Sequence, residues 1–292
     1  MTAQFAPIVV AIDETMEQGS SLRFAAAEAT RTHRPLQVAH VLDTVWSPPH
    51  SVLISYEAEA SVARSLVTHA ANRLRELTAD AVPVETLVRH GGVVDQLVEL
   101  SMSAHMVILE QRDLTRLERA FTGSVSGGLA SRSNVNVVIV PQLWQPPEGF
   151  LNQVLLGVGE WQGATPLFEH AFDMAEQHGA ALRVLHAWCL PAIYQDALID
   201  ARSIAYWQEA VTVEIEAAFT EGHSRHPGVK VTVDVMHGRP ADALLEASRE
   251  ADLLVLGRRN AVHPVIQHLG SLTRAMIRTA ACPGDVIPRP FS

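Results

Sequence analysis

The sequence contains an internal repeat that spans nearly the whole chain. Residues 89–110 can be laid over residues 236–257 with a constant shift of 147 positions. The residues that recur at this shift are His90 and His237, Gly91 and Gly238, Asp95 and Asp242, Leu97 and Leu244, Glu99 and Glu246, Ser101 and Ser248, Ala104 and Ala251, and Leu109 and Leu256. A single shift kept over such a length predicts a duplicated domain, because unrelated segments do not stay in register.

The start of each half repeats with a shift of 146, one position less, which aligns residues 7–14 with residues 153–160. Between the two copies, residues 141–153 contain three prolines and a glycine, a composition typical of a linker. We therefore expect a first domain over residues 1–147 and a second over residues 148–292.

Length and composition agree with two soluble domains. A chain of 292 residues exceeds the size at which single cores usually stop growing, about 250–300 residues. The formal net charge of −10 repels phosphate backbones and anionic lipids, which argues against nucleic acid or a membrane as a partner. No apolar run approaches the roughly 20 residues of a membrane-spanning helix, and the first residues do not form a secretory signal. With only two cysteines, a cytoplasmic protein is the expectation.

Short apolar runs alternate with helix-like segments in both halves. In the first half the predicted strands are 8–12, 36–42, 84–90, 105–109 and 136–140, and the predicted helices lie near 20–32, 56–77, 93–103 and 124–133. In the second half the predicted strands are 154–158, 181–188, 229–237, 252–257 and 285–288, and the predicted helices are one that ends near 178 and others near 202–222, 240–250 and 271–279. This alternation predicts an α/β protein with two repeated doubly wound domains, each a five-stranded parallel sheet with helices on both faces. Ligands of such Rossmann-like sheets bind beyond the carboxyl ends of the strands, where the strand order reverses.

The loops at these strand ends keep a fixed spacing. The first half has Asp13 after its first strand, and the segments after the fourth strands read Glu110-x2-Asp113-x9-Gly123-Ser124 and Gly257-x2-Asn260-x9-Gly270-Ser271. With this order of elements the chain resembles a tandem-domain bacterial universal stress protein, whose fold is similar to that of the adenine nucleotide alpha hydrolases. In that family a Gly-x2-Gly-x9-Gly-Ser/Thr loop binds the phosphates of ATP, and the acid after the first strand helps to hold the adenosine. The resemblance implies ATP or another adenine nucleotide as a ligand.

The spacing also has a physical rationale. A strand end followed by glycines and a helix start presents unpaired backbone N–H groups and the positive end of a helix dipole to an anion. The hydroxyls of Ser124 and Ser271 lie where each could cap its helix or donate to a phosphate oxygen, and the sequence leaves both roles open.

The residues in the loops depart from the family pattern. Glu110 and Asp113 place two negative charges where ATP would bring more, and each carboxylate–phosphate pair costs about 1 kcal/mol at the dielectric of water and about 4 at an effective value of 20. Two such costs remove most of a micromolar affinity, which is about 8 kcal/mol. A bridging Mg²⁺ or reoriented side chains would reduce the cost. The second half reverses the pattern, because Gly257, Arg258 and Arg259 favour phosphate while Gly159 replaces the acid.

The candidate nucleotide contacts are therefore the strand ends and the loops and helix starts that follow them. In the first half they are Ile12, Asp13, Val41, Leu109, Glu110, Asp113, Gly123, Ser124, Val125 and Ser126, and in the second half Val158, Gly159, Ala187, Leu256, Gly257, Asn260, Gly270, Ser271, Leu272 and Thr273. We expect degenerate pockets with weak or lost ATP binding. The alternative is a protein that senses nucleotide through one of its two domains.

Other readings of the sequence are less favoured. The histidine pairs His263/His268 and His223/His226 lack a third ligand, so local hydrogen bonding is expected rather than a metal site. His40 and His186, at the ends of the second strands, are read as structural. Cys282 is read as a small buried apolar residue.

No enzymatic activity is expected. A nucleophile elbow would need a serine at position 125, which is Val125, and no candidate general base lies beside the loops. The five tryptophans show no periodicity of a stacking platform for nucleic acid.

The last strand of each half is a sheet edge. The apolar run 136–140 invites pairing, and in the family two domains dimerise through this strand. We therefore predict that the two halves pack as an intrachain pseudo-dimer, and a homodimer of chains stays open. An unidentified protein partner is the expected target if the pockets bind no nucleotide.

Overall fold

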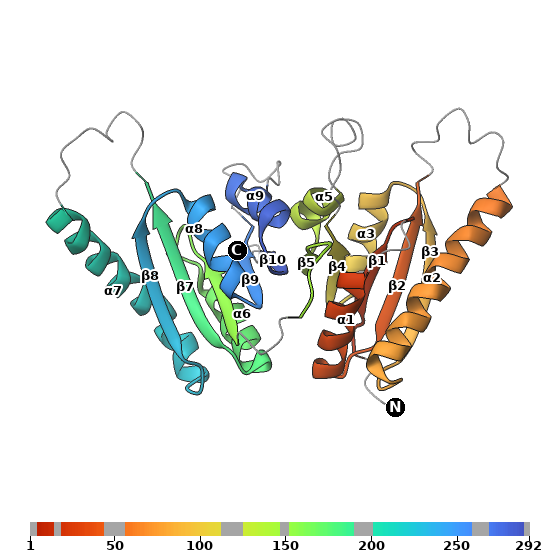
Figure 1. The fold of residues 1–292 in the computed structure, drawn as a ribbon, viewed down its shortest axis with the longest axis horizontal. Coiled ribbons are helices and arrows are strands. Elements are labelled where there is room, and N and C mark those ends of the chain that lie inside the picture. Colours follow the sequence, from red (N-terminus) through yellow and green to blue (C-terminus); the bar gives the residue numbers. More distant parts are fainter. Residues whose placement is uncertain are drawn as a thin grey trace. The chain divides into compact units, whose positions relative to one another are not determined.

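The computed structural model of the chain describes residues 5–14, 19–43, 56–111, 125–146, 152–189, 201–258 and 269–288. The chain divides into two compact units, of which the first ends its main segment at Pro146 and the second contains β6 to β10 (Figure 1). The predicted boundary between residues 147 and 148 falls outside the described residues and stays a prediction.

Unit 1 is a parallel five-stranded sheet with the strand order β3-β2-β1-β4-β5. Its elements are β1 (Ile8–Ile12), α1 (Gly19–Thr32), β2 (Leu36–Leu42), α2 (Tyr56–Thr78), β3 (Val84–His90), α3 (Val93–Ser101), β4 (Met106–Glu110), α5 (Val125–Arg132) and β5 (Asn136–Val140). Helix α1 packs against α2, and α3 packs against α5. Because right-handed crossovers run in opposite directions from β1, the two helix pairs cover opposite faces of the sheet.

Unit 2 repeats this topology with the strand order β10-β9-β6-β7-β8. Its elements are β6 (Gln153–Gly157), α6 (Thr165–His178), β7 (Ala181–Trp188), α7 (Ala201–Arg225), β8 (Val231–His237), α8 (Pro240–Ala247), η3 (Ser248–Glu250), β9 (Leu253–Gly257), α9 (Ser271–Thr279) and β10 (Gly284–Ile287). Here α6 pairs with α7, and α8 pairs with α9. The predicted fold class and the order of elements are confirmed in both units.

The central strands are buried on both faces, as their continuous apolar sequences predict. Ile8, Val10, Leu155 and Leu156 have no exposed surface, whereas β3 and β8, each at one end of the strand order of its unit, are only half-buried. The small side chains of α1 fit this architecture, because Ala25 and Ala29 are fully buried and let the helix approach the sheet closely.

Two helices end earlier than the sequence pattern predicts. The helix expected over 93–103 ends at Ser101, and the one expected over 240–250 ends at Ala247 and continues as the 3₁₀ turn η3. The hydroxyls of Ser101 and Ser248 each donate to a carbonyl three residues earlier, at 2.7 Å, and so tighten the last turn. Equivalent serines in the two copies thus end equivalent helices.

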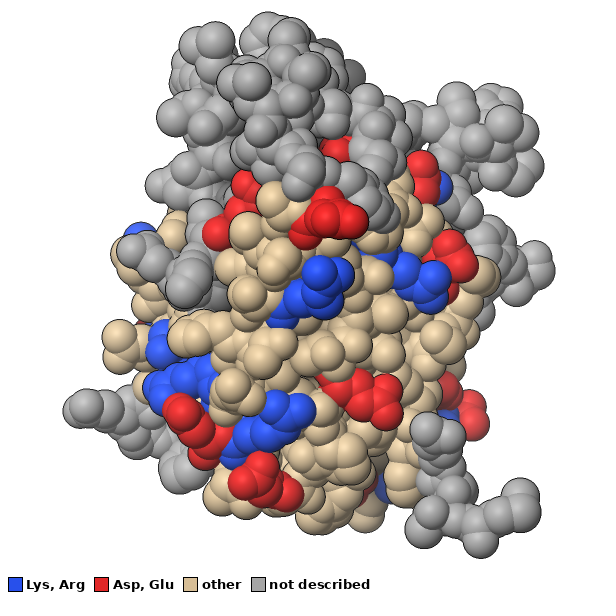
Figure 2. All heavy atoms as spheres, turned by 90° about the vertical axis from the view of Figure 1, so that its right-hand side faces the viewer, with Lys and Arg blue, Asp and Glu red and all other residues tan. Residues whose placement is uncertain are grey.

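On the face of unit 1 that includes α2, side chains of both charges are intermixed (Figure 2). Figure 2 shows basic and acidic side chains together on the face that includes α2, although the chain has a net charge of −10. Helix α2 contributes Arg73 and Glu76, which form an ion pair at 2.8 Å. In the described part of the chain, every helix is too short or too polar to cross a bilayer.

Candidate functional site

The strand order reverses between β1 and β4 in unit 1 and between β6 and β9 in unit 2. Connections leave toward opposite faces at such a point, which is where open α/β sheets bind ligands. Asp13 directly follows β1 and Glu110 ends β4, so both acids lie at this edge of unit 1. Gly159 and Gly257 take the equivalent places in unit 2. The structure therefore brings the predicted strand-end residues together in each unit.

The carboxylate of Glu110 is bound to the first turn of α1. Its Oε2 accepts hydrogen bonds from the backbone N–H and the hydroxyl of Ser21, both at 3.0 Å, and Ser21 is fully buried. A carboxylate at this position complements the positive end of the helix dipole. Burial raises the pKa of the Glu110 carboxyl, the hydrogen bonds from Ser21 oppose that shift, and the charge of Asp13 adds to it.

This geometry alters the expected role of Glu110. The sequence suggests a carboxylate that opposes phosphate directly, but the structure shows that Ser21 already holds the carboxylate. The nearby Asp13 carboxylate still acts on Glu110 electrostatically, so the edge of unit 1 contains two interacting acids.

In unit 2, uncharged residues occupy the positions that correspond to Glu110 and Ser21 of unit 1. Gly257 stands where unit 1 has Glu110, and Leu167 stands at the 146-residue shift where unit 1 has Ser21. A Cβ atom added at Gly257 would come within 3.3 Å of Leu167 Cδ2, so the leucine fills the space that a side chain at position 257 would need. A buried polar pair in one unit corresponds to a glycine–leucine contact in the other.

Arg258, directly after β9, is a basic residue with only 7% of its surface exposed. Burial lowers the pKa of its guanidinium. Its backbone N–H donates to the carbonyl of Ile287 at 3.2 Å, which ties the loop after β9 to β10. The residue that follows Gly257 at the end of β9 is thus a buried arginine whose backbone is held to β10.

The structure at the start of α9 tests one of the two roles considered for Ser271, which were to cap the helix or to donate to a phosphate oxygen. Gly270 is the residue that precedes the helix, and the structure shows no side-chain hydrogen bond that caps it. Ser271 is the first helical residue and is exposed, so it does not cap α9. Thr273 is buried, and its hydroxyl donates to the carbonyl of Gly257 at 3.2 Å. This bond holds the start of α9 against the end of β9.

The two equivalent histidines have the same structural role. His40 is buried and its Nδ1 lies 3.0 Å from the carbonyl oxygen of Ile12, and the Nδ1 of His186 lies 2.9 Å from that of Val158. A carbonyl oxygen accepts from an N–H at this nitrogen, so each ring binds the backbone at the carboxyl end of the first strand of its unit. The structural interpretation of both histidines is confirmed.

Three tryptophans gather at the end of β7, which the sequence alone did not indicate. Trp161 meets His186 edge to face at 5.1 Å between ring centroids, and Trp188 packs against Trp207 at 4.2 Å. His237 contacts Trp188 from the neighbouring strand at 4.6 Å. At the shift of 146, Leu42 of the first copy corresponds to Trp188 of the second. The alignment of the two copies therefore indicates that they differ at this strand end.

The remaining predicted contacts divide into three groups. Buried apolar residues at the strand ends are Ile12, Val41, Leu109, Val158 and Leu256. Partly buried residues are Ala187, Leu272, Val125 and Ser126, the last two in the first turn of α5. Asp113, Gly123, Ser124 and Asn260 lie outside the described residues. The described residues thus include those that border the predicted phosphate loops.

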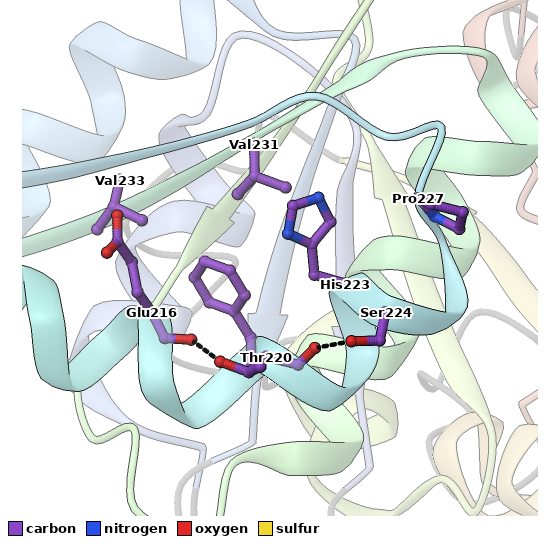
Figure 3. Close-up of a pocket in the computed structure, with 8 residues that line it drawn as sticks. Glu216, Thr220, His223, Ser224, Pro227, Val231 and Val233 are labelled. Carbon is purple, nitrogen blue, oxygen red and sulfur yellow. Dashed lines mark hydrogen bonds between the residues drawn. The ribbon is translucent and has the colours of Figure 1, made fainter.

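A separate groove lies between α7 and β8 (Figure 3). Its lining includes Phe219 and His223 from the helix and Val231 and Val233 from the strand. Val231 is the first residue of β8, so this groove lies away from the carboxyl ends of the strands. It is not part of the predicted nucleotide site.

His226, one of the histidines outside the site, makes local contacts. His226 lies 3.0 Å from a carboxylate oxygen of Glu176 and 3.3 Å from one of Asp173. Across the residues that the structure describes, no cluster of three or more His, Cys, Asp or Glu side chains is placed to hold a metal ion. His263 and His268 lie outside those residues.

Comparison with known proteins agrees with this arrangement. The sequence profile described as "Universal stress protein family" matches residues 4–141 and again residues 151–288. A universal stress protein of Mycolicibacterium smegmatis is 29% identical over 96% of both chains, and one of Mycobacterium tuberculosis is 26% identical over 94% of this chain and 93% of its own. The crystal structure of a universal stress protein from Archaeoglobus fulgidus has the same fold, with a TM-score of 0.70 at 17% identity over 97% of this chain and 96% of its own. The chain therefore belongs to the universal stress protein family and carries two domains of that family in tandem.

Proposed function

We propose that this protein is a non-catalytic regulatory protein of the stress response, whose two adenine-nucleotide pockets have lost most of their affinity for ATP. The observation that carries this proposal is the pair of hydrogen bonds from Ser21 to the Glu110 carboxylate at the end of β4. That carboxylate occupies the start of α1, so an anionic ligand at these strand ends gains nothing from the dipole of that helix and meets a fixed negative charge. In unit 1 the Glu110 carboxylate therefore takes the place of a bound anion at the start of α1.

The charge balance in unit 1 supports weak binding. Asp13 and Glu110 interact electrostatically, and a triphosphate beside them adds further negative charge. Each carboxylate–phosphate contact at about 4 Å costs between about 1 and 4 kcal/mol, depending on the local dielectric.

The second candidate function is nucleotide sensing through unit 2 alone. It is favoured by Gly257, which leaves the end of β9 without a carboxylate, and by the buried basic residue Arg258 that follows it in the chain. What unit 2 lacks is the acid after its first strand, since Gly159 stands there. We propose that unit 2 binds adenine nucleotide better than unit 1 does, and that neither unit turns it over.

Gly159 offers a direct test, because a Cβ atom added there meets no atom within 4 Å and its φ lies outside the left-handed region. We expect Gly159→Asp to strengthen binding of Mg²⁺-ATP by about tenfold, the value of one charge-assisted hydrogen bond. Isothermal titration calorimetry with the full chain measures this. Gly159→Asn, which keeps the size and removes the charge, is the matched control.

Three outcomes are informative. Tight binding of ATP by the natural protein would contradict the proposal of weakened pockets. An unchanged affinity in Gly159→Asp would contradict a nucleotide pocket at the edge of unit 2. Phosphate release above that of a heat-inactivated sample would contradict the absence of turnover.

The assembly of the protein is a further part of this proposal. The pairing of the two halves through the strands near 136–140 and 285–288 stays a prediction, as do a homodimer and a protein partner. Analytical ultracentrifugation of the full chain measures the oligomeric state directly.

A further inference from the structure

Helix α7 has apolar residues on two opposite sides. Val211, Ile215 and Phe219 are buried, and α7 packs against β8 and α6, as expected for a helix that covers the sheet of unit 2. On the other side, Tyr206 is 76% exposed and Val213 is 60% exposed. A helix on the surface of a domain normally has charged and polar residues there.

The exposed apolar residues form a continuous stripe. Tyr206, Ala210, Val213 and Ala217 are all exposed and follow one another at intervals of four, three and four residues. This is the spacing of the a and d positions of a helix that packs along a second helix. The stripe extends over about 17 Å, at about 1.5 Å per residue. In Figure 1, no labelled element of unit 2 lies on the side of α7 that faces away from β8.

Glutamates flank the stripe on both sides. At 100° per residue, Glu209 and Glu216 lie along one border of the stripe, and Glu214 and Glu221 lie along the other. Glu221 has Arg225 at 3.8 Å, and Arg225 also pairs with Glu169. Within the described residues, no cation lies within ion-pair distance of Glu209, Glu214 or Glu216. Between Tyr206 and Ala217 the borders of the stripe are therefore acidic, and the exposed Arg202 lies one turn before Tyr206.

The same position in unit 1 lacks this pattern. The outward side of α2 contains Val62, which is 60% exposed, but Ser65, His69 and Asn72 continue that side as polar residues. Both signs of charge occur on the face of unit 1 that includes α2 (Figure 2). The apolar stripe with acidic borders is thus a feature of unit 2 and not of the fold.

We propose that the stripe on α7 is a docking surface for an amphipathic helix of a partner protein with basic residues beside its apolar stripe. The flanking positions of two packed helices face each other, so acidic borders favour Lys or Arg on the partner. A second copy of α7 would bring four further glutamates to the contact and is disfavoured by the same charges. A stable interface buries about 800 Å² of accessible surface on each partner, and the contact of one helix with another buries less. The complex is therefore transient. This proposal does not depend on nucleotide binding.

The test uses a synthetic helical peptide of about three heptads with leucine at its a and d positions and lysine at the flanking positions. Fluorescence anisotropy measures its binding to the full chain, and a twin peptide with glutamate at the flanking positions is the charge control. We expect the lysine peptide to bind at least about tenfold more tightly than its twin, with an affinity that falls as salt rises.

Variants of the protein locate the contact. The double variant Tyr206→Gln, Val213→Gln keeps the net charge and is expected to weaken binding of the lysine peptide by at least about tenfold. Val62→Gln on α2 is the matched control and is expected to change nothing. Glu209→Gln with Glu214→Gln leaves the apolar stripe intact and is expected to reduce the salt dependence. All these side chains are exposed, and melting temperatures show that the variants are folded.

Three results would overturn the proposal. The first is equal binding of the two peptides, the second is binding that the stripe variant does not change, and the third is an equal loss in Val62→Gln. Self-association of the natural protein that the stripe variant abolishes, seen by sedimentation, would instead assign the stripe to a second copy of this chain.

Discussion

His170 Nε2 lies 2.6 Å from Asp285 Oδ2 inside unit 2, and the Asp285 side chain is fully buried. The first copy has apolar residues at these places, since Phe24 corresponds to His170 at the shift of 146 and Val138 to Asp285 at the shift of 147. One copy of the domain therefore contains an ionic pair where the other contains two apolar side chains. Asp285 Oδ1 is also buried, and the described residues offer it no hydrogen-bond partner.

The ion pair of His170 and Asp285 can be replaced by the phenylalanine and valine that the first copy has at these positions. We expect His170→Phe alone to cost about 3–5 kcal/mol of the free energy of unfolding, because the buried Asp285 carboxylate loses its partner. His170→Phe with Asp285→Val is expected to recover this loss, since buried ion pairs are often replaced by apolar residues at no cost. Urea denaturation of the three proteins measures the coupling. A double variant as unstable as the single one would show that the pair is needed for packing.

The same pair makes stability depend on pH. Burial of His170 favours the neutral ring, but the charge and hydrogen bond of Asp285 outweigh burial, with a smaller contribution from Asp173, and the pKa of His170 is raised above 6.5. A histidine whose pKa is higher in the folded state stabilises the protein fully below its unfolded pKa, and this contribution is lost as pH rises through the folded pKa. We expect the natural protein to lose stability above about pH 6.5 relative to the apolar double variant. Melting temperatures recorded from pH 5 to pH 9 measure the difference. Parallel pH curves for the two proteins would contradict it.

Glu110 is expected to matter for folding as well as for ligands. Glu110→Gly removes the acceptor from the buried N–H and hydroxyl of Ser21, at a cost of about 1–3 kcal/mol. Adding Ser21→Leu copies the Gly257–Leu167 contact of unit 2 and is expected to restore part of the loss. Denaturation midpoints of the single and double variants measure this, and strictly additive effects would contradict the pairing.

The raised pKa of Glu110 predicts a second pH effect. Because the folded protein holds the proton to higher pH than the unfolded chain does, the stability gained from protonated Glu110 is lost as pH rises above about 4.5. Glu110→Gln imitates the protonated group and does not titrate. The natural protein should therefore lose stability relative to Glu110→Gln as pH rises above that value. The difference in denaturation midpoint between the two proteins, measured from pH 4 to pH 8, tests this. A difference that stays constant or has the opposite sign would contradict the shift.

The two cysteines are expected to differ in reactivity. Burial raises the pKa of the Cys282 thiol to about 12, so it carries almost no thiolate at pH 8, whereas Cys189 is exposed. A thiol reagent such as Ellman's should modify one cysteine in the native protein and both in denaturant. Cys189→Ser should show no fast reaction, and a fast reaction there would mean that Cys282 is accessible.

The fold was predictable because it depends on local patterns that recur along the chain. Continuous apolar runs such as 8–12 and 136–140 became strands with the predicted limits, since a strand buried on both faces needs apolar residues at every position. The repeat then required one topology for both halves. Helix ends were less predictable, because the bonds of Ser101 and Ser248 to the backbone carry no periodic signal.

The sequence by itself determined the two tandem α/β domains and the presence of Gly159 where the first copy has Asp13, and it predicts the edge of each sheet at which a ligand would bind. Only the tertiary structure decided that Glu110 bonds Ser21, that His170 meets Asp285, and that Tyr206 and Val213 face solvent. The physical reason is sequence distance. Strand and helix patterns follow from neighbours within a few positions, whereas Ser21 and Glu110 are 89 residues apart and meet only when the sheet is complete.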